Sequence, residues 1–423
     1  MTDNSLLFTS KKLQDSDPEV YKHIRAELKR QQETLELIPS ENIVSEDILE
    51  AQGSVLTNKY SEGYPGRRYY GGNEHIDKIE TLAIERAKKL FRAEHANVQP
   101  LSGAVMNIAT YFGILQPGDT ILGMDLAHGG HLTHGHPVTH MYKVFNFVRY
   151  KTNVNDGSID YDELRKLALE HKPKLLLAGF SAYTRTLDWK KFKEIADEVG
   201  ALTMADVSHI GGLIAGKVLE NPMDHGFDIM TTTTHKSLRG PRGGLILCKE
   251  KFAKAIDKAV FPGLQGGPLE HVIAAKAVCF KAALEDDFKE YSKQVIENAK
   301  ACEMGLRKEN ITILHGGTEN HMLLLDLRPL AIKGKIAEEV LDSVNLCTNK
   351  NMIPEDDAHP LDPNGIRLGV PAITSRGLNS EDCFKVGELL GRTLNNIENT
   401  DIHKEVKKEV LELCRKYPIY PEL

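Results

Sequence analysis

The chain has 423 residues, of which 41% are hydrophobic and 27% charged, and it carries a formal net charge of −7 at pH 7. This length and composition are typical of a soluble globular protein with a large core and two domains, and the acidic balance argues against a nucleic-acid-binding surface. No apolar run is long enough to cross a membrane, no secretory signal is visible at the N-terminus, and the six cysteines form no Cys-x-x-Cys pair, which predicts reduced thiols and a cytoplasmic location.

An N-terminal helical arm is predicted first. Residues 15–36 favour a helix, because the segment Asp15-Ser-Asp-Pro-Glu is typical of a capped start with proline in the first turn. The sparse apolar residues that follow suit an arm lying on a partner. A turn at residues 37–42 then carries Ser40, for which a helix cap is one interpretation.

Residues 57–72 form a predicted loop dominated by glycine, proline and tyrosine. Five of its sixteen residues are Gly or Pro and four are Tyr. So many rings with so little aliphatic content suit the lining of a polar pocket, where Tyr hydroxyls reach ligands. A tyrosine-rich interface loop is the alternative.

A helix over residues 76–91 is predicted from its apolar spacing. The segment Leu101-Ser-Gly-Ala-Val-Met-Asn follows and leads into the apolar run 108–115. A Ser-Gly turn that opens a helix directs free N–H groups at an anion, so this turn is a candidate phosphate site. Many helices begin this way, and the signal alone is weak.

A strand over residues 119–125 ends in a segment with histidines at 128, 131, 134 and 136. Such a cluster is compatible with a metal site, but no carboxylate or thiolate lies at a spacing typical of one. We therefore expect no metal, and favour an imidazole stacked on an aromatic cofactor ring. The pair Gly129-Gly130 would let the backbone approach a ligand closely.

Strands and helices alternate between residues 144 and 200, for example in a strand at 174–180 and a capped helix starting at Asp188. This alternation predicts a parallel, doubly wound sheet. Asp206 and His209 follow the next strand, at the sheet edge where ligands bind in such folds. A helix cap for Asp206 and a core position for His209 are the alternatives.

A threonine-rich strand before residue 234 leads into His235 and Lys236, then into a turn rich in glycine and proline, and the apolar run 245–248 follows. One interpretation is a hairpin with a solvated lysine, and the other is one amine presented to a bound carbonyl. Pyridoxal phosphate (PLP) needs a lysine for a Schiff base, an acid group facing its pyridine nitrogen and N–H donors for its phosphate. Lys236 and Asp206 are candidates for the first two.

The last third is predicted to form a smaller α+β domain. A glycine-dense loop at 261–268 precedes a helix from 271 to about 310 with breaks, and then strands at 311–314 and 321–327 and a helix at 336–344. Ser380 is predicted to cap a helix over 381–395, and a charged helix begins at 403. Between glycine-containing turns, Arg367 suits a bidentate grip on a carboxylate, with a surface arginine as the alternative. We expect an arm at 1–50, a large PLP-binding domain at 51–285 and a small domain at 286–423.

With Thr-Thr-Thr-Thr-His-Lys-Ser followed by Gly-Pro-Arg-Gly-Gly at residues 231–244, the chain resembles the serine hydroxymethyltransferases from about residue 37 to 417. The resemblance implies PLP fold type I, the aspartate aminotransferase-like α/β fold. Its large domain has a mixed, mostly parallel sheet sandwiched by helices, accompanied by the small domain and the arm. It also implies an enzyme that reversibly transfers the hydroxymethyl group of L-serine to tetrahydrofolate through a Schiff base, giving glycine and 5,10-methylenetetrahydrofolate. The implied assembly is a homodimer, or a tetramer, with active sites at the interface.

The same resemblance implies roles for individual residues. Lys236 would bind PLP covalently, Asp206 would face the pyridine nitrogen and His131 would stack on the ring. Further cofactor contacts would come from Ser102, Gly103, Ala104, Ser181 and His209, with His235 and Arg242 flanking the lysine. The substrate carboxylate would be held by Ser40 and Arg367, while Glu62 exchanges a proton with the hydroxymethyl end. Residues reaching the neighbouring subunit's site would be Tyr60 and Gly266, to the phosphate, and Tyr70, to the substrate carboxylate. The pterin would lie against Leu126, Gly130, Leu132 and Asn351.

Four residues depart from the family pattern. The family usually carries a hydroxyl at position 104, Gln-Ala at 105–106 and threonine at 370, where this chain has Ala104, Val105, Met106 and Val370. One lost hydrogen bond to phosphate would weaken cofactor binding by about 1–2 kcal/mol. These departures leave open a folate-independent β-hydroxy-amino-acid aldolase or an α-methylserine-specific enzyme. An aminotransferase and an inactive scaffold or nucleic-acid binder are further alternatives. Glu62 argues against the aminotransferase, and the intact candidate residues argue against the inactive scaffold.

Overall fold

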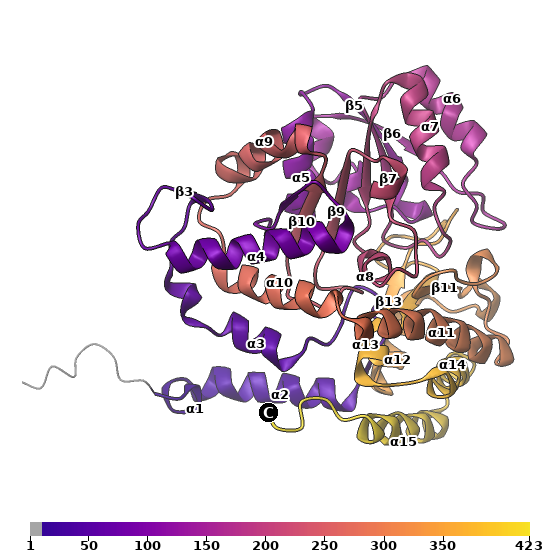
Figure 1. Cartoon of the computed structure of the whole chain (residues 1–423). Helices are drawn as coiled ribbons and strands as arrows, with labels where there is room; N and C mark the ends of the chain where they lie inside the picture. The colour runs from indigo at the N-terminus through magenta and orange to yellow at the C-terminus, as the bar shows by residue number, and fades with distance from the viewer. Residues whose placement is uncertain (1–10) are drawn as a thin grey trace, which may run out of the picture.

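The computed structural model describes residues 11–423. The first ten residues, where the predicted arm begins and where the sequence shows no secretory signal, lie outside the described part. Figure 1 shows a large sheet with helices on both sides, a smaller C-terminal unit beside it, and the N-terminal helices α1 and α2 running along one end near the C-terminus.

The central sheet has seven strands in the order β4-β10-β9-β8-β7-β5-β6. The strands from β9 through β8, β7 and β5 to β6 pair in parallel, while β10 is antiparallel to both β9 and β4. This mixed, mostly parallel sheet confirms the predicted α/β class. The strands are β4 His95–Asn97, β5 Thr120–Met124, β6 Asn146–Tyr150, β7 Leu175–Gly179, β8 Leu202–Asp206, β9 Ile229–Thr233 and β10 Gly244–Cys248.

Both faces of this sheet are buried, and successive strand residues alternate between two cores. Leu176 and Ala178 of β7 join the larger core, whereas Leu175 and Leu177 join the smaller one. The helices of this unit are α3 Glu46–Gln52, α4 Glu74–Phe91, α5 Gly103–Ile114, α6 Tyr161–His171, α7 Trp189–Val199, α8 Gly211–Ala215, α9 Glu250–Lys258 and α10 Glu270–Ala283. Helices α5 and α9 cover the smaller core, and α4, α7, α8 and α10 contribute to the larger one. The loop at 57–72 contains the two-residue strands β2 Gly63–Tyr64 and β3 Arg67–Arg68.

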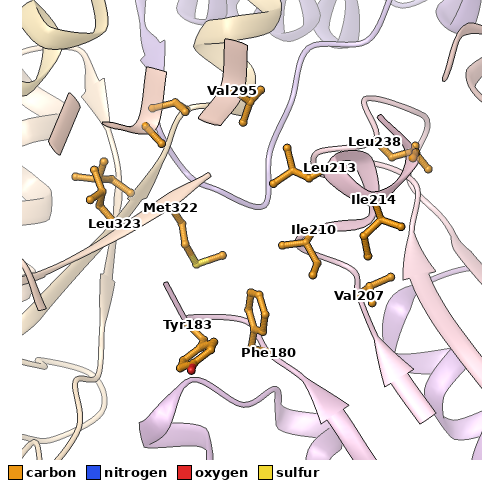
Figure 2. Close-up of a cluster of buried hydrophobic side chains, with 14 of the residues drawn as sticks. Phe180, Tyr183, Val207, Ile210, Leu213, Ile214, Leu238, Val295, Met322 and Leu323 are labelled. Carbon is orange, nitrogen blue, oxygen red and sulfur yellow. The ribbon is translucent and has the colours of Figure 1, made fainter. Parts of the chain in front are cut away.

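The C-terminal unit packs helices around a three-stranded antiparallel sheet of order β11-β14-β13. Its elements are α11 Asp286–Lys308, β11 Met322–Asp326, α12 Gly334–Ser343, β12 Leu346–Cys347, β13 Asn349–Asn351, β14 Gly365–Gly369, α13 Pro371–Arg376, α14 Ser380–Leu394 and α15 Thr400–Lys416. The larger core continues into this unit: Figure 2 shows Met322 pointing towards Phe180 and Ile210 of the large unit, and Val295 belongs to the same core.

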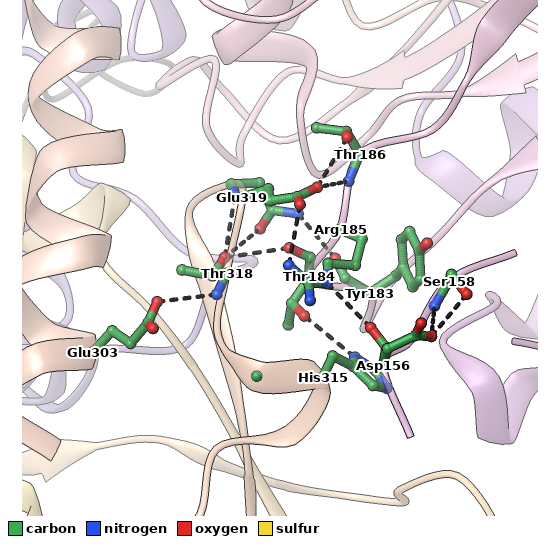
Figure 3. A network of polar contacts seen from close by, with 12 residues as sticks. Asp156, Ser158, Tyr183, Thr184, Arg185, Thr186, Glu303, His315, Thr318 and Glu319 are labelled. Atoms are coloured by element: carbon green, nitrogen blue, oxygen red, sulfur yellow. Dashed lines mark hydrogen bonds and ion pairs between the residues drawn. The ribbon is translucent and has the colours of Figure 1, made fainter. Parts of the chain in front are cut away.

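Polar contacts join the same two units close to the end of β7 (Figure 3). Arg185 forms an ion pair with Glu319 at 3.1 Å, and the Thr186 backbone N–H donates to the Glu319 carboxylate at 2.7 Å. His315 lies 3.2 Å from the Thr184 hydroxyl. These contacts fix the segment after β7, which includes Ser181, against the C-terminal unit.

The structure corrects three boundaries predicted from the sequence. The helix predicted over 15–36 is split into α1 Leu13–Ser16 and α2 Pro18–Glu33, because the backbone of Asp17 is not helical and its side chain accepts from the Val20 N–H. Leu35–Glu36 form strand β1, which pairs with β12. The predicted strand 311–314 is an irregular segment with one isolated bridge, from Ile313 to Leu325. The cap of α14 is Asn379 rather than Ser380, since the Asn379 side chain accepts from the Asp382 N–H.

Candidate active site

Lys236 lies in the connection between β9 and β10, where the chain passes close to other elements. A Cβ on Gly243 would lie 2.5 Å from Lys276 Cε, so glycine is needed for this close approach. Lys236 is half-buried. Burial lowers the pKa of Lys236 to about 8, partly opposed by the negative charge of Asp206 and reinforced by Arg367 and Arg242. This setting differs from the solvated hairpin lysine considered as an alternative.

Asp206 is the last residue of β8 and is almost fully buried, with 5% of its surface exposed. Its Oδ2 accepts from Asn107 Nδ2 at 2.8 Å and from His134 Nε2 at 3.1 Å, and its Oδ1 accepts from the Ser208 hydroxyl at 2.6 Å. Burial opposes ionisation, but the hydrogen bonds, the one from His134 foremost, hold the pKa of this carboxyl well below its usual range. Asp206 is therefore a fixed negative charge beside Lys236.

His131 precedes a short 3-10 turn, Leu132–His134, and its Nδ1 accepts from the Thr133 N–H at 3.2 Å. Burial lowers the pKa of His131 to about 4, reinforced by His134 and partly opposed by Asp206. The ring is thus neutral at physiological pH. A Cβ on Gly130 would collide with the carbonyl of Met124, which explains the glycine just before this histidine.

Arg367 projects from β14 and carries no acid partner among residues 11–423. Its Nε donates to Asn349 Oδ1 at 3.1 Å and its Nη1 donates to the Ser181 carbonyl at 2.6 Å. Burial lowers the pKa of Arg367 to about 10, so the guanidinium stays charged at neutral pH. A largely desolvated cation without a counter-ion is costly, which indicates that the site is built for an anion.

Ser40 lies close to the end of the same strand. A Cβ on Gly369, two residues after Arg367, would lie 2.5 Å from Pro39 Cβ, and the Gly369 N–H donates to the Leu37 carbonyl at 2.8 Å. His209 and His321 complete this side of the site, with 3.4 Å between Nδ1 of His209 and Nε2 of His321. Burial holds the pKa of His209 well below its usual range and lowers that of His321 to about 3.

Ser102, Gly103 and Ala104 form the start of α5, as predicted from the sequence. The Ser102 hydroxyl caps the helix by accepting from the Val105 N–H at 3.4 Å, and all three residues are half-buried. Because the first N–H groups of a helix lack intrahelical partners, this turn can bind an anion. Gly103 packs against Thr233, the last residue of β9, which brings the helix start close to the lysine connection.

Glu62, Tyr60, Tyr70 and Gly266 form a second group in the structure. The Tyr60 hydroxyl lies 3.3 Å from Glu62 Oε1, the Tyr60 and Tyr70 rings are 5.1 Å apart, and a Cβ on Gly266 would lie 3.3 Å from the same Glu62 oxygen. Tyr60 and Tyr70 are 54% and 47% exposed. The chain thus brings these four residues together, but their contacts are with one another. They do not contact the residues around Lys236, which we call the Lys236 group: Lys236, Asp206, His131, Arg367 and Ser40.

The remaining predicted residues lie around the first group. His235 Nδ1 accepts from the Gly243 N–H at 3.3 Å, and burial, with the nearby charge of Arg242, lowers the pKa of His235 to about 3. Arg242 and Leu132 are exposed, Leu126 is half-buried, and Asn351 ends β13, the edge strand next to β14.

Sequence reasoning missed the residues that hold the candidates in place, namely Asn107, His134, Ser208 and Asn42. Ser208 was foreseeable, because a hydroxyl two residues after an aspartate commonly bonds its carboxylate. His134 lay in the histidine cluster that we weighed as a metal site. In the part of the chain that the structure describes, no group of three or more His, Cys, Asp and Glu is placed to hold a metal ion. Within residues 11–423, no helix is both long and apolar enough to cross a membrane.

The α/β fold with a mixed sheet, a lysine between β9 and β10, and a buried carboxylate at the end of β8 define the class of PLP-dependent enzymes of fold type I. The model of one family within that class, serine hydroxymethyltransferase, matches residues 13–390. The chain belongs to the serine hydroxymethyltransferase family. It is therefore a PLP-dependent enzyme of one-carbon group transfer, with tetrahydrofolate as co-substrate.

The side chains present fit PLP chemically. The cofactor needs an amine, an anion for its ring nitrogen and N–H donors for its phosphate. Lys236, the ionised Asp206 and the start of α5 provide these groups on connected segments of the sheet edge. Ala104 offers no hydroxyl, so side-chain bonding to a phosphate depends on Ser102 in this turn.

Proposed function

We propose that the protein reversibly transfers the hydroxymethyl group of L-serine to tetrahydrofolate, giving glycine and 5,10-methylenetetrahydrofolate. The observation that carries this proposal is the charged Arg367, which has no acid partner among residues 11–423, close to a lysine whose pKa is lowered to about 8. An amino acid supplies both a carboxylate for the first and an α-amine for the chemistry at the second.

Each residue in the Lys236 group has a proposed role. Lys236 holds the cofactor and, with a lowered pKa, exchanges its proton readily near neutral pH. Asp206 holds a proton on the ring nitrogen, and the neutral His131 stacks on the ring. When bound, PLP supplies an electrophilic carbonyl and a ring that accepts electrons from bonds at the amino acid's α-carbon. Arg367 and Ser40 orient the carboxylate and so select which of those bonds lies perpendicular to the ring.

We propose that Glu62 moves the proton at the serine hydroxyl, and that it acts in the site of a second subunit. This is supported by its place in the second group, beside the exposed Tyr60 and Tyr70. Exposed aromatic rings of this kind are typical of interfaces. In the proposed homodimer, Tyr60 and Gly266 reach the partner's cofactor phosphate and Tyr70 reaches the partner's substrate carboxylate.

The proposed pterin site uses Leu126, Gly130, Leu132 and Asn351. Leu132 is 43% exposed beside His131, which suits an apolar contact with a flat ring. A second candidate function, a folate-independent aldolase or an α-methylserine-specific transferase, is favoured by Ala104 and by the buried Val370, which replaces a hydroxyl near Arg367.

We also propose domain limits at residue 50 and at residue 285. The second limit is supported by the break between α10 and α11, at Leu284 and Glu285. A cytoplasmic location is proposed because all six cysteines are free thiols, five of them buried.

The test is to incubate the purified, PLP-loaded protein with L-serine, with and without tetrahydrofolate, and to measure glycine and methylenetetrahydrofolate. We expect both products only with the carrier. Cleavage of L-threonine at a comparable rate without the carrier, or reaction with α-methylserine but not with serine, would instead establish the second candidate.

A further inference from the structure

Asn42 lies where three segments of the site meet. It follows Ser40 by two residues, on the N-terminal segment that packs against the end of β14. Its Nδ2 donates to the backbone carbonyl of Lys236 at 2.9 Å and to the hydroxyl of Tyr291, on α11, also at 2.9 Å. Its Oδ1 accepts from the hydroxyl of Ser375, on α13, at 2.6 Å.

One side chain thus bonds the lysine connection of the large unit and two helices of the C-terminal unit. Both amide protons and the amide oxygen are used, which is close to the full capacity of an asparagine. Tyr291 strengthens the junction, since its hydroxyl lies 3.3 Å from the Ser237 carbonyl and the Arg239 guanidinium lies 4.3 Å from the centre of its ring.

We propose that Asn42 is a positioning residue, which sets the backbone of Lys236 relative to Ser40 and the C-terminal unit that carries Arg367. The proposal rests on the function proposed above for Lys236, Ser40 and Arg367. Asn42 touches neither substrate nor cofactor in this account. The amine of Lys236 and the carboxylate-binding side chains of Ser40 and Arg367 belong to three separate segments. Asn42 lies on the same segment as Ser40, and its amide bonds the Lys236 carbonyl and the C-terminal unit that carries Arg367.

The asparagine amide is specific for this task. Alanine would leave the carbonyl of Lys236 without its donor and the hydroxyl of Ser375 without its acceptor. Serine at position 42 would keep a polar side chain but would be too short to reach the lysine connection. The groups that set the charge environment of Lys236, which a shift of its backbone would disturb, are Asp206, Arg367 and Arg242, with His131, His209, His235 and His321 close by.

The test compares Asn42→Ala and Asn42→Ser with Asn221→Ala. Asn221 is a matched control, because its buried amide also donates to a backbone carbonyl of another segment, that of Phe91, and accepts from a backbone N–H, that of Met223. Three quantities are measured: the urea-unfolding midpoint, the PLP dissociation constant of the apoprotein, and the pH at which the visible band of the PLP-loaded protein is half-converted. None of these requires turnover. The KM and kcat for L-serine are measured as well.

We expect both Asn42 variants to shift the half-conversion pH by at least about half a unit and to raise the KM for serine about 5- to 30-fold, the effect of one lost hydrogen bond that leaves a partner unsatisfied. Asn221→Ala is expected to lower the unfolding midpoint while leaving the half-conversion pH and the KM for serine unchanged. Equal half-conversion pH and PLP affinity in the two sets of variants would overturn the proposal, because Asn42 would then be only a stabilising contact. If Asn42→Ala does not fold, Asn42→Ser decides. The wild type could form no glycine from serine while the Asn42 variants still shift the half-conversion pH. That result would support the positioning role and refute the proposed reaction.

Discussion

Replacing Arg367 with alanine tests the core of the proposed site. An arginine has five N–H donors, and two of its nitrogens already donate, to Asn349 and to the Ser181 carbonyl. Three donors, on the two terminal nitrogens, are left for a bidentate contact with a carboxylate. Removing one member of a buried, hydrogen-bonded charge pair costs about 2–5 kcal/mol, which corresponds to a loss of about 30- to 4,000-fold in serine affinity.

The assay follows the change in the visible band of the PLP-loaded protein during titration with L-serine. The same titration with serinol, which has the amine and hydroxyl but no carboxylate, provides an internal control. We expect Arg367→Ala to weaken serine binding strongly while leaving serinol binding and the PLP dissociation constant within about threefold of wild type. Arg328→Ala is the matched variant, since Arg328 lies on the same small unit but pairs with Asp326 and is half exposed.

Two results would refute the reasoning. If serine affinity falls by less than about fivefold, the guanidinium does not bind the carboxylate, since even one charge-assisted hydrogen bond exceeds that value. If serine and serinol lose affinity equally, the change acts through the fold, by releasing the Ser181 carbonyl, and not through the charge.

Three further outcomes follow from buried groups. Ala104→Ser should tighten PLP binding about 2- to 10-fold by adding one hydrogen bond at the start of α5, measured by fluorescence titration of the apoprotein; unchanged affinity would show that the hydroxyl is not needed. Burial, reinforced by Glu80, raises the pKa of Glu270 to about 7 from an ordinary value of 4.5. This group therefore stabilises the fold fully below pH 4.5, and as pH rises towards 7 it lowers the free energy of unfolding by up to about 3 kcal/mol. In urea unfolding between pH 5 and 8, Glu270→Gln should remove this fall in the free energy of unfolding. Substitution of the exposed Glu297 should retain it. Lys276→Met should lower the free energy of unfolding by about 3 kcal/mol, because the Lys276 ammonium donates to three backbone carbonyls within 3.1 Å; an unchanged unfolding curve would contradict this.

The sheet was largely predictable from the sequence because its strands are buried on both faces. Such strands appear as short apolar runs bounded by polar or turn residues, and the predicted strand 119–125 is Thr120–Met124 in the structure. The irregular segment at 311–314 was not predictable in this way. It is flanked by Asn310 and His315, which adopt φ values of 59° and 57°, and apolar residues between two such turns resemble a strand in sequence alone.

The candidate site was predictable where it depends on strand ends. Asp206 ends β8 and Lys236 follows the neighbouring strand β9, and parallel strand ends meet at one edge of a sheet, so the influence of Asp206 on the pKa of Lys236 agrees with the sequence pattern. Partners from distant segments were not predictable. The residues that hold the Asp206 carboxylate, Asn107 and His134, lie 99 and 72 positions away, and no local pattern encodes their approach.

The histidines around Lys236 keep the charge of the site low because they are neutral. Burial lowers the pKa of His131, His209, His235 and His321. Asp206, Arg367 and Arg242 all lie close enough to Lys236 to shift its pKa, and Asp206 is the one acid among them, so the surroundings of Lys236 carry a positive excess within a protein whose net charge is −7. Desolvation, reinforced by His134, Lys236 and Arg367, keeps the pKa of His131 at about 4, so this ring adds no positive charge at physiological pH. In the proposed site, this excess would be available to a phosphate and a carboxylate, and the neutral imidazole would stack on a protonated ring without repulsion. A cation in place of that imidazole would oppose the ring charge that we propose Asp206 stabilises.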